Sequence, residues 1–264
     1  MEQEIKNKEQ GTRKQENRNL HTMKAMIFAA GKGTRLQPLT NTIPKALVKI
    51  NGIPMLEIVI KKLIGNDFDE IIINLHHFSK QIIEFIEMKN SFGIRIEFSI
   101  EEEKLLNTGG GLKNAKDFFN DDKDFLLHNV DIISEINLKE VYSFHQNNNA
   151  LATVVVKDRK TSRYLLFDEE NLLAGWENIK TGEKIISRKL NKNLTPLAFC
   201  GIHIINPRIF DLINEKGAFS IIDLYLRLSK DQKIMAFDID HTFWTDIGKP
   251  EELISLQDLA LFNR

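Results

Sequence analysis

The stretch "FAAGKGTRLQPLTNTIPKAL" (residues 28–47) continues a short apolar strand over 25–30 into a Gly-x-Gly turn. It matches neither common phosphate-binding fingerprint. Leu36 stands where the dinucleotide motif needs its third glycine, and no Gly-Lys-Ser/Thr ending is present. Glycine lets the backbone turn tightly and come close to a ligand, and such a turn can present amide N–H groups to phosphate oxygens. Gly31 and Gly33 therefore predict an anion-binding turn at the end of a strand.

Two cations in this stretch suit a phosphate ligand. Arg35 carries a planar fork of donors, and Lys45 carries a compact point charge. Pro38 and Pro44 disfavour a long helix here, so we expect the chain to stay extended and to lie over the ligand. The alternative is an ordinary strand and turn with solvated cations, because a single Gly-x-Gly motif is weak by itself.

Length and composition indicate one domain over residues 23–264 and exclude several classes of partner. The chain has 264 residues with 36 basic and 37 acidic side chains, a formal net charge of -1. This balance predicts no broad basic surface for nucleic acid or an anionic membrane. Residues 1–22 are poor in apolar side chains and are expected to be a disordered tail. Cys200 is the only cysteine, which fits a cytoplasmic protein.

Apolar patterns in the first half alternate between helix and strand. Helices are predicted over 54–68, 79–89 and from 109, and strands over 69–77, 94–100 and 124–131. This order predicts an α/β fold with a mainly parallel sheet and helices on both faces. Ligands of such sheets bind beyond the carboxyl ends of the strands. Short strands joined by turns predict a smaller, hairpin-rich lobe after about residue 151.

Two aspartates follow apolar runs and are candidate metal ligands. Asp131 closes the strand over 124–131, and Asp246 precedes Gly248 and a helix that begins near Pro250. Mg²⁺ is commonly held by one or two carboxylates together with substrate phosphates and waters. The alternative is that Asp131 begins a turn and Asp246 caps a helix.

The segment "NTGGGLKNA" (residues 107–115) opens a helix with three consecutive glycines. Glycine is costly in conformational entropy within a helix, and the sequence offers no packing reason for three of them. A flat ligand such as a base, lying against bare backbone, would explain them. A flexible loop at the start of the helix is the alternative.

These residues together resemble the sugar-1-phosphate nucleotidylyltransferases. The matching segments are "MIFAAGKGTRLQPLTNTIPKAL", "TGGGL", "FLLHNVDI", "FCGIHIINPRIF" and "WTDIGKPEEL", in this order over residues 23–261. The likeness is greatest to the short bacterial members of the N-acetylmuramate 1-phosphate uridylyltransferase type. It implies a Rossmann-like nucleotide-binding core at about 23–150 and a sugar-binding lobe at about 151–264.

The resemblance implies Mg²⁺-dependent attack of a sugar 1-phosphate on the α-phosphate of a nucleoside triphosphate, with release of pyrophosphate. Site residues follow from the positions that match the family's motifs. The triphosphate loop is Ala30, Gly31, Gly33, Thr34 and Arg35; the catalytic cations are Arg35 and Lys45; the stretch against the base is Thr108, Gly109 and Gly110; the sugar contacts are Glu177, Asn178 and Gly201; the magnesium ligands are Asp131 and Asp246.

Two departures leave the substrate open. Val130 replaces the glycine of the usual Asn-Gly-Asp, and "KDRKTSRYLLF" lacks the expected proline-rich segment. UTP with N-acetylmuramate 1-phosphate is the first expectation, and a mannose- or heptose-1-phosphate guanylyltransferase is the alternative. Arg159, Lys160 and Arg163 could meet the muramate carboxylate or form a solvated hairpin face. A metal-dependent glycosyltransferase using "DID" (238–240) and an inactive nucleotide-sugar sensor are the remaining alternatives. Oligomeric state is not predicted.

Overall fold

A mixed ten-stranded sheet forms the centre of the computed structural model, which describes residues 22–102, 104–188 and 193–257. Strand β1 (Met23–Phe28) lies between β4 (Phe68–Leu75) and β6 (Phe125–Asn129) and is parallel to both. Strand β5 (Arg95–Ile100) pairs with β4 in the same direction. The carboxyl ends of these four strands therefore meet at one edge of the sheet, as expected for the parallel sheet that the sequence predicted. The predicted disordered tail falls, apart from Thr22, outside the described residues.

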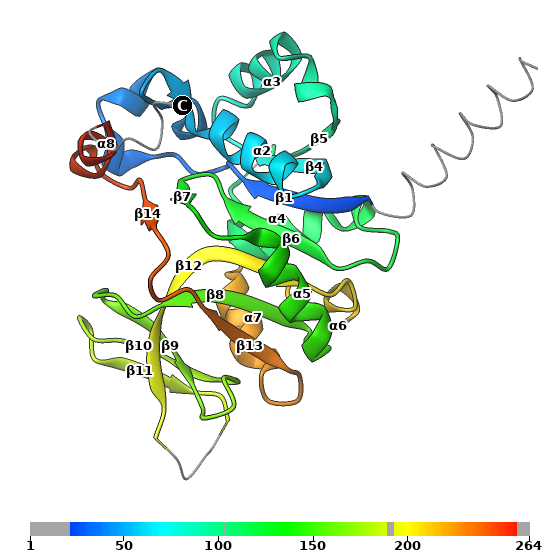
Figure 1. Ribbon diagram of the computed structural model, residues 1–264, viewed down its shortest axis with the longest axis vertical. Helices are drawn as coiled ribbons and strands as arrows, with labels where there is room; N and C mark the ends of the chain where they lie inside the picture. The colour runs from blue at the N-terminus through cyan, green and yellow to red at the C-terminus, as the bar shows by residue number, and fades with distance from the viewer. Residues whose placement is uncertain (1–21, 103, 189–192, 258–264) are drawn as a thin grey trace, which may run out of the picture.

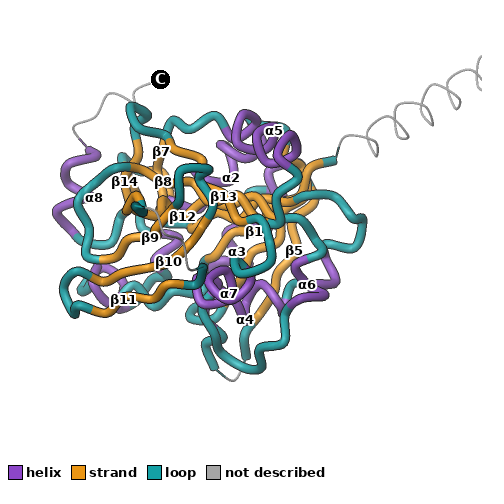
Figure 2. Tube along the Cα trace, turned by 90° about the horizontal axis from the view of Figure 1, so that it is seen from below, coloured by secondary structure: helices purple, strands orange, loops and turns teal. Residues whose placement is uncertain are grey.

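Helices cover both faces of this sheet (Figure 2). Met26 of β1 packs with α4 (Asn107–Asn114), α6 (Ile209–Leu212) and α7 (Ile221–Leu228). Its neighbours Ala25 and Ile27 point the other way, into a cluster with α2 (Met55–Gly65), α3 (Ser79–Met88) and α5 (Leu138–Asn148). This alternation is that of a strand buried on both sides. The predicted Rossmann-like α/β class is thus confirmed.

The long strand β12 (Thr195–Ile205) carries the sheet into the smaller lobe. Its second half is antiparallel to β6, and its first half pairs with β9 (Arg163–Phe167). The hairpin strands β10 (Leu173–Asn178) and β11 (Glu183–Ile186) follow β9 outward, at the lower left of Figure 1. Strands β8 (Ala152–Lys157) and β13 (Ile234–Asp238) pair beside β12. The sheet therefore passes without interruption from the core into the lobe.

The C-terminal segment returns to the core beside the glycine loop. Strand β14 (Trp244–Asp246) pairs with β7 (Ile132–Ser134), which comes shortly after β6. Helix α8 (Pro250–Gln257) contributes Leu253 and Leu256 to a cluster with Leu36 and with Ile50 of the small hairpin β2 (Lys49–Ile50) and β3 (Ile53–Pro54). This packing brings residues 244–248 next to the loop that opens the sequence.

The chain after β1 differs from the extended segment that the prolines predicted. It forms three short 3-10 turns: η1 (Thr34–Leu36), η2 (Leu39–Asn41) and η3 (Lys45–Leu47). Pro38 and Pro44 immediately precede the last two. Proline lacks an N–H but tolerates the first position of a turn, so it limits the length of the helices rather than excluding them.

No helix among the described residues is long and apolar enough to cross a membrane.

Candidate active site

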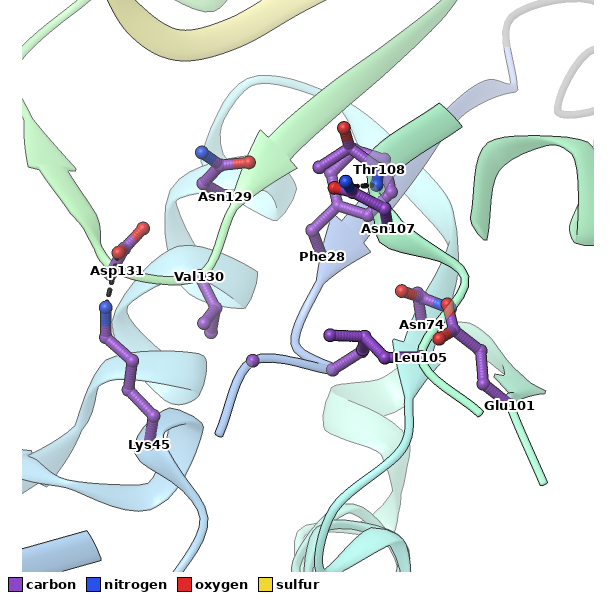
Figure 3. A pocket seen from close by; sticks show the side chains of 12 residues that line it. Phe28, Lys45, Asn74, Glu101, Leu105, Asn107, Thr108, Asn129, Val130 and Asp131 are labelled. Carbon is purple, nitrogen blue, oxygen red and sulfur yellow. Dashed lines mark hydrogen bonds and ion pairs between the residues drawn. The ribbon is translucent and has the colours of Figure 1, made fainter. Parts of the chain in front are cut away.

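A pocket of about 220 Å³ opens where the carboxyl ends of the parallel strands meet. Residues from four strand ends and from the start of α4 line it (Figure 3). They are Phe28, Ala30, Gly31, Lys45, Asn74, Glu101, Leu105, Asn107, Thr108, Asn129, Val130 and Asp131. The prediction that ligands bind beyond these strand ends thus coincides with a cavity.

Gly33 fixes the shape of the glycine loop. Its φ of 64° lies in the left-handed region, which glycine adopts without steric cost. Its carbonyl accepts hydrogen bonds from the Leu36 amide at 2.9 Å and from the Thr40 hydroxyl at 2.8 Å. A Cβ atom here would lie 2.9 Å from Cγ2 of Thr40 and 3.0 Å from Cβ of Lys45. Gly33 is therefore needed both for the turn and for the close approach of the segment that carries Lys45.

Lys45 and Asp131 form an ion pair at the mouth of the pocket (Figure 3). Lys45 is the first residue of η3, and Asp131 lies just beyond β6, so the pair joins two strand-end loops. The side chains are 12% and 22% exposed. Lys45 is thus largely covered, which argues against the alternative of a solvated cation at this position.

Asp246 lies next to Asp131 through backbone pairing. Asp246 is opposite Ile132 in the register of β14 and β7, and the amide of Ile247 donates to the carbonyl of Asp131 at 2.9 Å. Burial raises the pKa of Asp246; the charges of Glu252 and Asp131 act in the same direction, and that of Arg159 opposes them. The structure therefore brings together the two aspartates that lie far apart in the sequence.

Asp131 and Asp246 are of the residue type that can hold a magnesium ion. Among the described residues, no group of three or more His, Cys, Asp or Glu side chains could hold a metal. Mg²⁺ does not need such a cage, since one or two carboxylates with phosphate oxygens and waters complete its octahedron. A divalent cation would also relieve the repulsion between neighbouring carboxylates.

Arg35 reaches toward the same region from the glycine loop. A Cβ atom on Gly248 would lie 3.1 Å from Cζ of Arg35, so the exposed guanidinium packs on bare backbone two residues beyond Asp246. Glu252 accepts hydrogen bonds from the amides of Gly248 and Lys249 at 2.7 and 2.8 Å, which fixes the start of α8. Arg35, Lys45 and the two aspartates thus border one region.

The glycines of α4 have a packing role that the sequence did not reveal. The amide of Gly109 donates to the carbonyl of Phe219 at 2.9 Å. A Cβ atom on Gly109 would lie 2.3 Å from the Phe219 ring, and one on Gly110 would lie 2.7 Å from the Gly217 carbonyl oxygen. Of the three residues assigned to the base, Thr108 lines the pocket, whereas Gly109 and Gly110 contact the 217–219 loop. Their role toward a base stays a prediction.

Several pocket residues were missed from the sequence. Asn74 and Glu101 are buried, and the Asn74 amide donates to Oε1 of Glu101 at 2.9 Å. Oε2 of Glu101 accepts from the amide of Leu106 at 2.7 Å, which holds the start of α4. A polar residue within the apolar run "IIINL" is the signal that could have identified Asn74.

The predicted sugar contacts divide into two groups. Gly201 has a φ of 74° within an irregularity of β12, and a Cβ atom there would lie 2.9 Å from Nδ2 of Asn129, a pocket residue. Glu177 and Asn178 end β10 and do not line the pocket. Glu177 forms an ion pair with Lys184 at 3.0 Å. Gly201 is therefore next to the site, and the role of the other two stays a prediction.

Comparison with known proteins agrees with this α/β core. Residues 24–261 match the Nucleotidyl transferase family, and the chain belongs to this family. It is 31% identical over 242 residues to a mannose-1-phosphate guanyltransferase of Yarrowia lipolytica, covering 88% of this chain and 62% of the relative. It is 30% identical over 244 residues to a UTP–glucose-1-phosphate uridylyltransferase of Synechocystis, covering 86% and 60%. The chain thus spans about three fifths of these relatives.

A UDP-glucose pyrophosphorylase from Acinetobacter baumannii has the same fold, with a TM-score of 0.72. The two chains are 16% identical, and the match covers 89% of this chain and 92% of the other. At this identity the likeness concerns the fold alone.

Proposed function

We propose that the chain transfers a nucleotidyl group from a nucleoside triphosphate to a sugar 1-phosphate and releases pyrophosphate. The observation that carries the proposal is the Lys45–Asp131 ion pair at the pocket mouth with Asp246 paired beside it. Membership of the Nucleotidyl transferase family and the names of the relatives support it.

In this reaction an oxygen of the sugar phosphate attacks the α-phosphorus of the triphosphate. A new P–O bond forms, the bond between the α-phosphorus and the bridging oxygen breaks, and the electron pair leaves with pyrophosphate. Positioning and charge neutralisation suffice for such transfers. Residues 30–35 would hold the triphosphate, with Arg35 and Lys45 neutralising charge on the α-phosphate and the leaving group.

Asp131 and Asp246 would hold Mg²⁺, which when bound neutralises phosphate charge and orients the triphosphate. Lys45 pairs with Asp131 in the structure, so a group that would neutralise phosphate and a group that would hold the metal are fixed next to each other.

The comparisons favour GTP as the nucleotide over UTP, which was the first expectation from the sequence. Several of the curated relatives are mannose-1-phosphate guanyltransferases at 28–31% identity. We therefore place GTP with mannose 1-phosphate or a related sugar phosphate first, and UTP with N-acetylmuramate 1-phosphate second. A uridylyltransferase matches almost as well, so both bases belong in the test.

A screen of four nucleoside triphosphates against a panel of sugar 1-phosphates, read by pyrophosphate release, tests the proposal. Nucleotidyl transfer predicts pyrophosphate only when both substrates are present. Release of free nucleoside diphosphate from a nucleotide sugar in the presence of an acceptor would instead support the glycosyltransferase, whose candidate residues Asp238 and Asp240 are exposed and do not line the pocket. Binding of a nucleotide sugar without turnover of any pair would support the sensor.

A further inference from the structure

Arg159 lies where the smaller lobe meets the aspartate pair. It follows the end of β8, and its guanidinium carbon is 4.3 Å from the centre of the Trp244 ring. Its Nη2 donates to the carbonyl of Phe199 at 3.1 Å, and Nε1 of Trp244 donates to the carbonyl of Cys200 at 2.8 Å. Phe199 and Cys200 are the two residues before Gly201, so Arg159 and Trp244 are fixed against the irregular part of β12 that lies next to the pocket residue Asn129.

Among the described residues, the guanidinium of Arg159 forms no ion pair with a carboxylate, although Asp246 lies on its side of β14. Its Nη2 contacts a neutral carbonyl, its face lies on an aromatic ring, and its buried Nε has no hydrogen-bond partner among those residues. The next residue, Lys160, is exposed, whereas Arg159 is half-buried. A cation removed from water without a counterion is costly, so a bound anion would stabilise it.

Arg159 lies on the same side of β14 as Asp246. Trp244 and Asp246 are two residues apart in this strand, and such residues point to the same face. Because Arg159 stacks on Trp244, its charge lies on the same face of β14 as Asp246. The two neighbouring aspartates, Asp131 and Asp246, thus lie between a cation on the glycine-loop side, Lys45, and one on the side of the smaller lobe, Arg159.

We propose that Arg159 binds an oxyanion of the sugar-phosphate substrate on the lobe side of the aspartate pair. The inference rests on the proposed function, because it assigns the nucleotide to the glycine-loop side and the sugar phosphate to the lobe side. The oxyanion is either the 1-phosphate or a carboxylate carried by the sugar. Arginine suits both, since its planar fork donates two parallel hydrogen bonds to phosphate or carboxylate.

A purely structural role is the competing explanation. Arg159 would then only hold the carbonyl of Phe199 and the ring of Trp244, and its loss would destabilise the irregular part of β12 without a specific effect on sugar phosphates. Thermal unfolding of Arg159→Met and Arg159→Lys measures this effect independently of ligand binding. Arg159→Lys keeps the charge and is the variant to use if Arg159→Met does not fold.

Titration calorimetry with mannose 1-phosphate and N-acetylmuramate 1-phosphate, the sugar phosphates of the two substrate proposals, tests the inference. We expect Arg159→Met to weaken binding about ten- to a hundredfold, the range for losing hydrogen bonds to a charged group. Arg208→Met, the matched control, makes the same change at an exposed arginine that does not line the pocket and should stay within about twofold. Equal losses for both ligands identify the 1-phosphate as the oxyanion. A loss confined to the muramate compound identifies the carboxylate.

Calorimetry measures binding and needs no turnover. A negative result here therefore counts against the role of Arg159, whereas a negative pyrophosphate screen counts against the proposed reaction. Unchanged affinity in folded Arg159→Met, equal losses in Arg159→Met and Arg208→Met, or wild-type protein that binds neither ligand would each overturn the assignment of Arg159. Partial affinity in Arg159→Lys supports it, because lysine keeps the charge but loses the planar fork. If binding is lost only to the extent that the folded fraction of the variant falls, the result would instead support the structural role.

Discussion

Replacing Lys45 by methionine removes the ammonium group that contacts Asp131 and keeps most of the side-chain stem. If Lys45 neutralises charge in the transition state, pyrophosphate release should fall on the order of 10²–10³-fold, as for the loss of a comparable preorganised contact. That fall corresponds to about 2.7–4 kcal/mol in the activation free energy. Lys49→Met is the matched control, since Lys49 is an exposed lysine four residues further on.

The same change should also affect stability, because the ion pair is largely covered. An exposed pair contributes up to about 1 kcal/mol, whereas breaking a buried pair costs about 3–5 kcal/mol. At 12% and 22% exposure, we expect a loss of about 1–2 kcal/mol in the free energy of unfolding. For a domain of this size, each kcal/mol lowers Tm by about 2–4 °C.

Magnesium should raise the Tm of Lys45→Met more than that of the wild type. The variant leaves Asp131 and Asp246 adjacent without the lysine, and a divalent cation offsets their repulsion. Steady-state rates and scanning calorimetry with and without Mg²⁺ measure the two effects. A folded variant that keeps more than about a third of wild-type turnover would refute the catalytic role, since it lies far outside the expected range.

Three further predictions concern packing and protonation. Gly109→Ala should cost about 1–3 kcal/mol because its Cβ would clash with the Phe219 ring; chemical denaturation should show this loss and none in Gly65→Ala, where nothing lies within 4 Å. Burial lowers the pKa of Lys62 to about 8. Between about pH 8 and 10.5 the unfolded chain therefore binds more protons than the folded protein, so the free energy of unfolding should rise with pH in this range. A rise of equal size in Lys62→Met would contradict this. Burial raises the pKa of the Cys200 thiol to about 12, so a maleimide should label it only after denaturation, and rapid labelling of native protein at pH 8 would refute its burial.

The parallel core could be predicted from the sequence because its signals are local. The strand that ends at Phe28, the glycine turn and the carboxylate of Asp131 at a strand end all follow from short-range patterns. Strand ends of a parallel sheet meet at one edge, so these patterns also locate the pocket. Local periodicity thus determined both the class of fold and one side of the site.

Contacts between distant segments could not be predicted. Asp246 reaches Asp131 only through the pairing of β14 with β7. Position 109 has to be glycine because the Phe219 ring packs where a side chain would lie. Neither β14 nor β7 exceeds three residues, which is too short for a distinct periodicity. The burial of Lys45 likewise depends on three turns folding together rather than on any one motif.

Transfer of label from radioactive nucleoside triphosphates tests the central claim most directly. With the base and sugar 1-phosphate identified by the screen, label at the α-phosphate should appear in a nucleoside diphosphate sugar, and label at the γ-phosphate should appear in pyrophosphate. Both transfers should require the sugar 1-phosphate and should be lost together in Asp246→Asn. Label from the γ-position in inorganic phosphate, or label from the α-position retained in free nucleoside diphosphate, would contradict nucleotidyl transfer.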